Sequence, residues 1–241
     1  IGALLLDYII TRLTESGTMP KNPAVVKTIV TTTLADRIAK AANVKVFNVL
    51  TGFKFIGEKI KEWEKSGEYT FLFGYEESYG YLRGTHARDK DAVVASMLTA
   101  EMVCYYESVG KGLYKRLIEL FDKFGYYREE VASIAYKGVT AMSDMSAAMS
   151  ALRAKTIRSL AGYDVLAVSD YLKGVTVNEN GTKEPTNLPE SDVLKFILEN
   201  EQFVCVRPSG TEPKLKIYVL CYDADAEKAK IKAETLMAAI R

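Results

Sequence analysis

The chain has few residues of the kinds that build disulfide frameworks or metal centres. Its 241 residues include one histidine and three cysteines, and no two cysteines have CxxC spacing. An odd and widely spaced set of cysteines argues against both a disulfide framework and a zinc site, so we expect reduced and mostly buried thiols. Whether Cys205 and Cys221 face each other across a hairpin is open at this level.

The chain also lacks a long hydrophobic segment and an excess of one charge. Its longest apolar run, residues 1–6 with 8–10 beyond Asp7, is too short and too interrupted to span a bilayer. It has no signal-peptide pattern, and because the first residue is not Met we expect a piece of a longer protein. With 32 Lys and Arg against 31 Asp and Glu, the net charge of +1 gives no general attraction to nucleic acid or anionic membrane. Neither is expected as a partner, and any anion site must be local.

The remaining composition is that of a folded protein with room for two domains. Hydrophobic residues at 48% and charged residues at 26% are ordinary globular values. The first half alternates strand-like and helix-like patterns, which is typical of an α/β domain with a largely parallel sheet. The expected elements are strands at 25–30, 44–49 and 69–74 and helices at 34–42 and 53–64.

Short polar segments follow each of the three expected strands. They are the threonines 31–33, the segment 51–54 that begins with Thr51 and Gly52, and the GYEESYG segment at 74–80. Ligands of open α/β sheets bind beyond the carboxyl ends of the strands. We therefore expect these three segments to form a site together.

The pattern changes at 125–128, which we take as a domain boundary. Two helices, 91–106 and 113–124, precede it, and we expect their apolar stripes to pack into the core. The segments beyond it follow no regular alternation, which favours an α+β domain. We predict one domain over 1–125 and a second over 126–241.

The second half is expected to close with a hairpin and a helix. Expected strands lie at 131–136, 165–168, 175–177, 203–206 and 215–222, and expected helices at 142–155, 191–199 and 229–240. Asn180 and Gly181 indicate a turn, and Ser191 or Asp192 would cap the helix at 191–199. The acids at 223–227 fit the start of the last helix better than a metal site.

An eight-residue connection, RPSGTEPK at 207–214, links the two hairpin strands. Ordinary hairpin loops have about 2 to 5 residues. Arginine grips phosphate oxygens bidentately, and glycine lets successive backbone N–H groups turn toward an anion. We predict an anion-binding loop, and the alternative is a solvated loop rich in turn residues. Its candidate ligands are Arg207, Ser209, Gly210, Thr211 and Lys214.

Two more segments carry groups suited to a sugar or to proton transfer. Glu76 and Ser78, with a second glutamate between them, follow a strand expected to be buried, and such groups hydrogen-bond to sugar hydroxyls. The alternative is that one glutamate caps an element and the other is solvated. The loop at 83–91 holds His86 and Lys90, for which a surface histidine and a helix-start salt bridge are the structural alternatives.

Taken together, RPSGTEPK, GYEESYGYL and the Thr51-Gly52 loop resemble the C-terminal half of the α-D-phosphohexomutase (phosphoglucomutase/phosphomannomutase) family. The resemblance covers essentially all 241 residues, and the EESYG form favours the phosphoglucomutase type. It implies a three-layer α/β domain, with a mixed, largely parallel sheet and helices on both faces. An α+β domain resembling the TATA-box-binding-protein fold would follow. It also implies a cytoplasmic enzyme.

In this family a phosphoserine transfers its phosphoryl group to a hexose phosphate, and the bisphosphate intermediate reorients before a phosphate returns to the serine. The resemblance implies that Thr51, Gly52, Glu76 and Ser78 bind the sugar. It assigns phosphate binding to Arg207, Ser209, Gly210, Thr211 and Lys214. Lys90 matches a basic position near the reacting centre, with His86 in the same loop. For the full-length enzyme it implies Mg²⁺ and glucose 1,6-bisphosphate as cofactors.

The sequence departs from the full family pattern in lacking a serine motif of the Ser-His-Asn type and an aspartate-rich metal loop. Both belong to the first two of the family's four domains, so we expect no metal ligands in this chain and expect those N-terminal domains as its partner. We expect residues 1–241 alone to have no mutase turnover. Phosphomannomutase or phosphopentomutase specificity stays an alternative. A non-catalytic anion-binding module is another, although the near-zero net charge argues against nucleic-acid binding.

Overall fold

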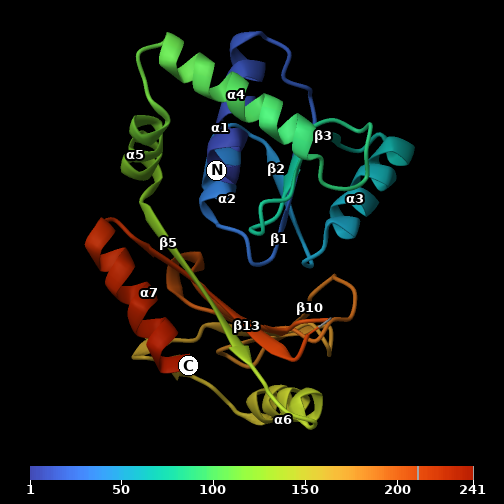
Figure 1. Ribbon diagram of the computed structural model, residues 1–241, viewed down its shortest axis with the longest axis vertical. Coiled ribbons are helices and arrows are strands. Elements are labelled where there is room, and N and C mark those ends of the chain that lie inside the picture. Colours follow the sequence, from blue (N-terminus) through green and yellow to red (C-terminus); the bar gives the residue numbers. More distant parts are fainter. Residues whose placement is uncertain (211, 241) are drawn as a thin grey trace. The chain divides into compact units, whose positions relative to one another are not determined.

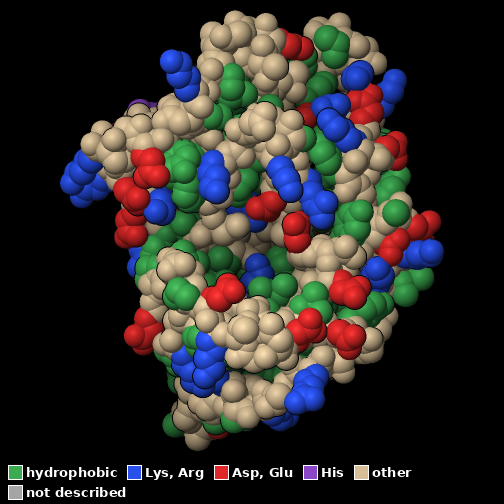
Figure 2. All heavy atoms as spheres, turned by 180° about the vertical axis from the view of Figure 1, so that it is seen from behind, with side chains coloured by type: hydrophobic (Ala, Val, Ile, Leu, Met, Phe, Trp, Pro, Cys, Tyr) green, Lys and Arg blue, Asp and Glu red, His purple; other side chains and the backbone are tan. Residues whose placement is uncertain are grey.

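The computed structural model describes residues 1–210 and 212–240. The chain divides into two compact units, Ile1–Phe124 and Gly125–Arg241, each with its own hydrophobic core (Figure 1). No helix among the described residues is long and apolar enough to cross a membrane. On the face that Figure 2 shows, basic and acidic side chains are interspersed, in keeping with a net charge of +1.

The first unit is a layered α/β structure around a four-stranded sheet with the order β2-β1-β3-β4. β1 pairs in parallel with both β2 and β3, and β4 is antiparallel to β3. The strands are β1 (Pro23–Thr28), β2 (Lys45–Val49), β3 (Thr70–Tyr75) and β4 (Tyr81–Leu82). The helices are α1 (Gly2–Glu15), α2 (Leu34–Ala41), α3 (Phe53–Ser66), α4 (Ala92–Ser108) and α5 (Leu113–Phe124). The predicted parallel α/β arrangement is confirmed.

Helices cover both faces of this sheet, with α3 on one side and α1 and α2 on the other (Figure 1). α3 packs through Ile56 and Ile60 against Ala24 and Val26 of β1, all fully buried. α1 is formed by the apolar run at the start of the chain. Residues 4–10 of this helix are all buried, so it packs into the core around most of its circumference.

An ion pair joins α1, α4 and α5. Asp7 is 6% exposed, and its carboxylate accepts from Arg116 at 2.7 and 2.8 Å and from the Tyr106 hydroxyl at 2.6 Å. These contacts raise the pKa of Arg116, chiefly through the hydrogen bonds to Asp7. A buried carboxylate of this kind is stabilised only by its partners.

The apolar stripe predicted for residues 91–106 is wrong in part. Met102 is buried, but Met97 of the same stripe is 68% exposed and Val93 beside it is 70% exposed. Val94, Leu98 and Tyr105 of the stripe are half-buried, so the periodicity selected the packing side of α4 in part. In α5 only Leu120 of the predicted stripe is fully buried.

The second unit is α+β, built on a seven-stranded sheet with the order β10-β9-β8-β11-β12-β13-β5 and antiparallel pairing throughout. The strands are β5 (Tyr126–Ala135), β8 (Ala167–Asp170), β9 (Val175–Asn178), β10 (Lys183–Pro185), β11 (Leu194–Ile197), β12 (Phe203–Pro208) and β13 (Lys214–Asp223). Helices α6 (Ala141–Ala154) and α7 (Ala226–Ile240) pack on one face of the sheet. A two-stranded ribbon, β6 (Ser159–Leu160) with β7 (Tyr163–Asp164), and a short helix, η1 (Glu199–Glu201), complete the unit.

The helix predicted at 191–199 is wrong, because this segment forms β11 between β8 and β12. Leu194 and Phe196 are buried and alternate with half-buried neighbours, as in a strand. Asp192 does not cap a helix but pairs with Arg153, whose guanidinium also contacts Asp170 at 3.1 Å. Pairing on both sides outweighs the local capping signal.

Two other local predictions, a turn and a helix start, are confirmed. The Asn180-Gly181 turn connects β9 to β10, with Gly181 at φ 82°. Asp225 accepts from the backbone of Lys228 at 2.9 Å, which confirms a helix start there.

The hairpin register pairs Cys205 with Tyr218, so Cys205 and Cys221 are not opposite each other. Both are buried free thiols and Cys104 is an exposed one, which agrees with the expectation of reduced and mostly buried thiols.

Candidate functional site

The segments that follow β1, β2 and β3 meet at the carboxyl edge of the first sheet, as the topology predicted. The Thr28 hydroxyl lies 2.7 Å from that of Thr31 and 2.9 Å from Glu77 Oε2, to which it donates. The backbone N–H of Gly52 donates to Glu76 Oε1 at 2.7 Å. Each segment is therefore linked to the segment that follows β3.

Glu76 and Ser78 differ in burial at this edge of the sheet. Glu76 is 8% exposed, and burial raises the pKa of its carboxyl, an effect that the Gly52 N–H partly opposes. Ser78 is exposed. The loop is closed by a hydrogen bond from Glu76 N to Gly80 O at 2.9 Å, and Tyr79 has a φ of 65° and is 81% exposed. The edge thus offers a buried carboxylate beside an exposed hydroxyl.

Lys90 packs against the loop at 76–80, whereas His86 pairs with Asp91. A Cβ at Gly80 would come within 3.2 Å of both Lys90 Cδ and Glu76 Oε2, so the lysine stem lies against the loop. Its ammonium pairs with Asp89 at 3.0 Å. His86 Nε2 lies 2.9 Å from Asp91 Oδ2, and Asp91 caps helix α4. That contact lowers the pKa of Asp91 and gives the histidine a structural partner.

The predicted anion-binding loop lies at the tip of the β12–β13 hairpin. Its basic and hydroxyl side chains lie on one face of that hairpin. Ser209 N donates to Lys214 O at 2.8 Å, and Arg207 lies opposite Lys216 in the ladder. Because side chains alternate along a strand, these four residues share one face of the hairpin. All four are half-buried. The opposite face, with Val206, Leu215 and Ile217, belongs to the core under α6 and α7.

Lys216 was not among the predicted residues. The only signal for it was the spacing of two from Lys214, which places both lysines on one face once the strand register is known. Lys214 itself pairs with Glu212 at 3.1 Å.

Gly210 does not adopt the backbone conformation that favours glycine. Its φ lies outside the left-handed region, and an added Cβ would meet no atom within 4 Å. The described chain therefore does not itself require glycine here, so a requirement would have to come from the bound anion. Thr211 lies outside the described residues.

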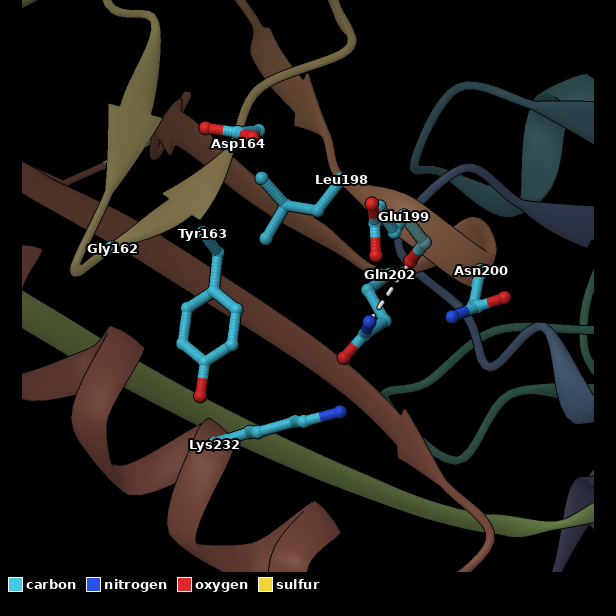
Figure 3. Close-up of a pocket in the computed structure, with 8 residues that line it drawn as sticks. All are labelled: Gly162, Tyr163, Asp164, Leu198, Glu199, Asn200, Gln202 and Lys232. Carbon is cyan, nitrogen blue, oxygen red and sulfur yellow. Dashed lines mark hydrogen bonds between the residues drawn. The ribbon is translucent and has the colours of Figure 1, made fainter.

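A pocket of about 190 Å³ lies at the other end of β12 (Figure 3). Two of its lining side chains bind other parts of the protein. Gln202 donates to Glu199 O at 2.9 Å and accepts from Tyr222 N at 3.1 Å. The Lys232 ammonium pairs with Asp223 at 2.7 Å. None of the residues that line this pocket belongs to the predicted motifs.

No group of three or more His, Cys, Asp or Glu side chains that could hold a metal ion is present in the described part of the chain.

Family models match both parts of the chain. Residues 1–124 match phosphoglucomutase/phosphomannomutase alpha/beta/alpha domain III, and residues 151–237 match the C-terminal domain of the same proteins. This chain belongs to the phosphoglucomutase/phosphomannomutase family.

Curated relatives include phosphoglucomutases of staphylococci. The chain is 38% identical over 221 residues to that of Staphylococcus haemolyticus, covering 91% of this chain and 39% of that protein. Against the Staphylococcus aureus enzyme it is 33% identical over 236 residues, covering 97% of this chain and 42% of that protein. The chain thus spans about two fifths of the length of these relatives.

Solved structures with the same fold include parafusin, a phosphoglucomutase from Paramecium, with a TM-score of 0.63 at 17% identity, covering 99% of this chain and 39% of that one. A phosphoglucomutase/phosphomannomutase family protein from Burkholderia thailandensis gives 0.52 at 10% identity, covering 99% and 41%.

Proposed function

We propose that this chain is the sugar- and phosphate-binding part of a longer phosphoglucomutase-like enzyme. The enzyme would interconvert hexose 1-phosphate and hexose 6-phosphate through a phosphoserine and a hexose bisphosphate. The observation that carries the proposal is the edge formed by Gly52, Glu76 and Ser78, where the family's sugar motif combines a fixed carboxylate with an exposed hydroxyl. Staphylococcal phosphoglucomutases that share 33–38% identity with the chain support it.

In this proposal, the first unit recognises the hexose. One oxygen of Glu76 is fixed by Gly52 N–H, which orients the carboxylate to accept from sugar hydroxyls. Ser78 donates or accepts at the same edge, and Thr51 lies beside Gly52. Lys90, whose stem contacts the loop, adds a positive charge near the sugar.

The hairpin of the second unit holds the phosphate that does not react. Arg207 would supply a fork of donors, Ser209 and Thr211 hydroxyls, Gly210 a backbone N–H group, and Lys214 a point charge. Phosphoryl transfer depends on positioning, so holding the distant phosphate aligns the other end of the hexose with the phosphoserine. The phosphoserine and Mg²⁺ would be supplied by the N-terminal domains, with glucose 1,6-bisphosphate as the intermediate.

The test compares the full-length enzyme with residues 1–241 alone. We expect the full-length enzyme to convert glucose 1-phosphate to glucose 6-phosphate when Mg²⁺ and glucose 1,6-bisphosphate are present. We expect the chain alone to give no turnover. Sustained isomerisation by residues 1–241 would contradict the division of labour.

Two further measurements on the same proteins test the substrate specificity and the non-catalytic alternative. Mannose and pentose phosphates assayed beside glucose 1-phosphate report the specificity of the full-length enzyme. Calorimetry with hexose phosphates and with oligonucleotides distinguishes a mutase part, which binds only the former, from a nucleic-acid-binding module.

A further inference from the structure

A charged side chain lies in the interior of the first unit, near the end of β1. Lys27 is 2% exposed, and its ammonium lies 3.0 Å from the carboxylate of Asp36, in the first turn of α2. It also donates to the carbonyl oxygen of Thr31 at 3.3 Å. Apolar side chains of similar volume often stabilise a fold as well as a buried ion pair does. What distinguishes Lys27 from an apolar residue is therefore the direction of its contacts.

The turn after β1 is held from both faces of the strand. Thr31 N donates to Thr28 O at 3.0 Å, and the hydroxyls of the two threonines lie 2.7 Å apart. Thr28 is fully buried, and Thr31 is 3% exposed. Because Lys27 and Thr28 are consecutive, their side chains leave opposite faces of β1, and both contact Thr31. These contacts fix the geometry of the turn.

Glu77 connects this turn to the loop that follows β3. The Thr28 hydroxyl donates to Glu77 Oε2 at 2.9 Å, and within the described part of the chain it is the only group that hydrogen-bonds to this carboxylate. An ionised carboxylate only accepts, so the single proton of the Thr28 hydroxyl points to Glu77, and the Thr31 hydroxyl donates to Thr28. A hydrogen bond to a carboxylate is stronger than one between neutral groups. The position of Glu77 therefore depends on the turn after β1.

We propose that Lys27 and Thr28 are positioning residues for sugar recognition. They fix the turn after β1, and through Glu77 that turn holds the loop at 76–80 in the geometry that receives the hexose. This inference rests on the proposed function and adds to it two buried residues that do not touch the sugar.

The position of Glu77 affects both residues that the sugar motif assigns to binding. Glu76 and Ser78 flank Glu77 in the sequence, and Glu76 is also held by the N–H of Gly52 at 2.7 Å. The loop is thus attached at two points, to the segment after β1 and to the segment after β2. A loop that is ordered before the hexose binds loses less conformational entropy on binding, so the affinity for the substrate is higher.

The first experiment measures the kinetics of the full-length enzyme with Thr28→Val, which keeps the shape of the side chain and removes the hydroxyl. We expect KM for glucose 1-phosphate to rise about tenfold, the loss of one charge-assisted contact, and kcat to change less than about threefold. Thr28→Ser, which keeps the hydroxyl, should retain most of the affinity. Thr70→Val is the matched control, because it removes a hydroxyl hydrogen bond to Asn22 at the other end of β3, and it should leave KM unchanged.

The second experiment tests the route through Glu77. Glu77→Met should raise KM, and the double variant with Thr28→Val should have the same KM as Glu77→Met alone, because no further contact to the loop is lost. Additive increases in KM would overturn this route.

The contribution of Lys27 is measured separately. Lys27→Met combined with Asp36→Asn removes the buried ion pair without leaving a lone charge. It should raise KM about threefold, less than Thr28→Val, because the lysine acts on the turn and not on Glu77 itself. An unchanged KM in this double variant would overturn the role of Lys27.

Inorganic phosphate distinguishes positioning from a general loss of structure. It has no sugar hydroxyls, so it should inhibit Thr28→Val as strongly as it inhibits the wild type. A threonine that only stabilises the fold would lower the fraction of active enzyme, so the apparent kcat would fall while KM stayed constant. Weaker inhibition of the variant by phosphate would show a disturbance beyond the sugar loop and would overturn the specific role.

The outcomes separate this inference from the proposed function. An unchanged KM in Thr28→Val overturns the positioning role, while turnover by the wild type leaves the mutase proposal intact. If the full-length wild type has no turnover, the proposed function fails, and calorimetry with glucose 1-phosphate then decides the role of Thr28. Weaker binding by Thr28→Val than by the wild type would support positioning, whereas equal binding or none would overturn it.

Discussion

At the scale of single residues, the candidate site is defined by how its polar groups are held. Glu76 is buried with one oxygen bound to Gly52 N–H, and Ser78 beside it is exposed. The alternative in which one glutamate caps an element and the other is solvated does not describe them, because Glu76 binds across to the loop after β2 and Glu77 binds Thr28. Both carboxylates of the motif connect loops of the sheet edge.

Glu76→Gln should separate stability from binding. Because burial raises the folded-state pKa above 4.5, the contribution of Glu76 to stability is full below that pH and is lost as pH rises through the folded pKa. At about pH 7.5 the neutral variant should therefore melt at or above the wild-type temperature, and the difference should shrink toward about pH 4.5.

The same Glu76→Gln substitution should lower the activity of the full-length enzyme. An amide places a donor where the sugar hydroxyl meets an acceptor, so kcat/KM of the full-length enzyme should fall about 10- to 100-fold. Melting curves across pH and steady-state kinetics check the two parts. A variant that is less stable than the wild type at neutral pH would contradict the buried-carboxylate explanation.

At the scale of elements, position in the fold outweighs local signals. The segment 191–199 carries a capping residue and apolar residues compatible with a helix, yet it forms β11 because β8 and β12 pair with it on both sides. In α4, by contrast, the helix was predicted correctly and its buried side only in part, because Met97 is exposed. Only contacts with the rest of the unit distinguish these cases.

The connection between α1, α4 and α5 gives a prediction at this scale. Arg116→Met should destabilise the protein by about 3 kcal/mol, because the carboxylate of Asp7 stays buried without its guanidinium partner. Asp7→Asn combined with Arg116→Met should recover part of that loss. Chemical denaturation of the four proteins of this cycle measures the loss and the recovery. Arg12→Met, which removes an exposed pair with Glu15, is the control and should have a much smaller effect, because solvent screens exposed pairs. Equal effects of the two arginines would refute the argument.

At the scale of the whole molecule, the chain is two units with separate cores. The sugar motif belongs to the first unit and the phosphate motif to the second. The chain also spans about two fifths of the length of its staphylococcal relatives. Activity is therefore proposed for a longer protein in which both motifs act on one substrate.

The three cysteines report on the folded state of the whole chain. Cys104 is exposed, whereas Cys205 and Cys221 are buried, and burial raises the pKa of Cys221 to about 12. In native protein, alkylation at mildly alkaline pH should modify Cys104 and leave the other two unmodified until denaturant is added, as peptide mass spectrometry can measure. Native modification of Cys221 at a rate near that of Cys104 would show that the core of the second unit opens.

The sequence by itself determined the alternation of strands and helices in the first half, the hairpin around RPSGTEPK and the two motifs. These follow from local periodicity, turn residues and the chemistry of side chains close together in the chain. Only the tertiary structure decided that 194–197 is a strand, that α4 buries Met102 and exposes Met97, and that Arg207 faces Lys216. Those features depend on strand register and on packing between segments far apart in sequence, where the free energy of burial and pairing exceeds local preference.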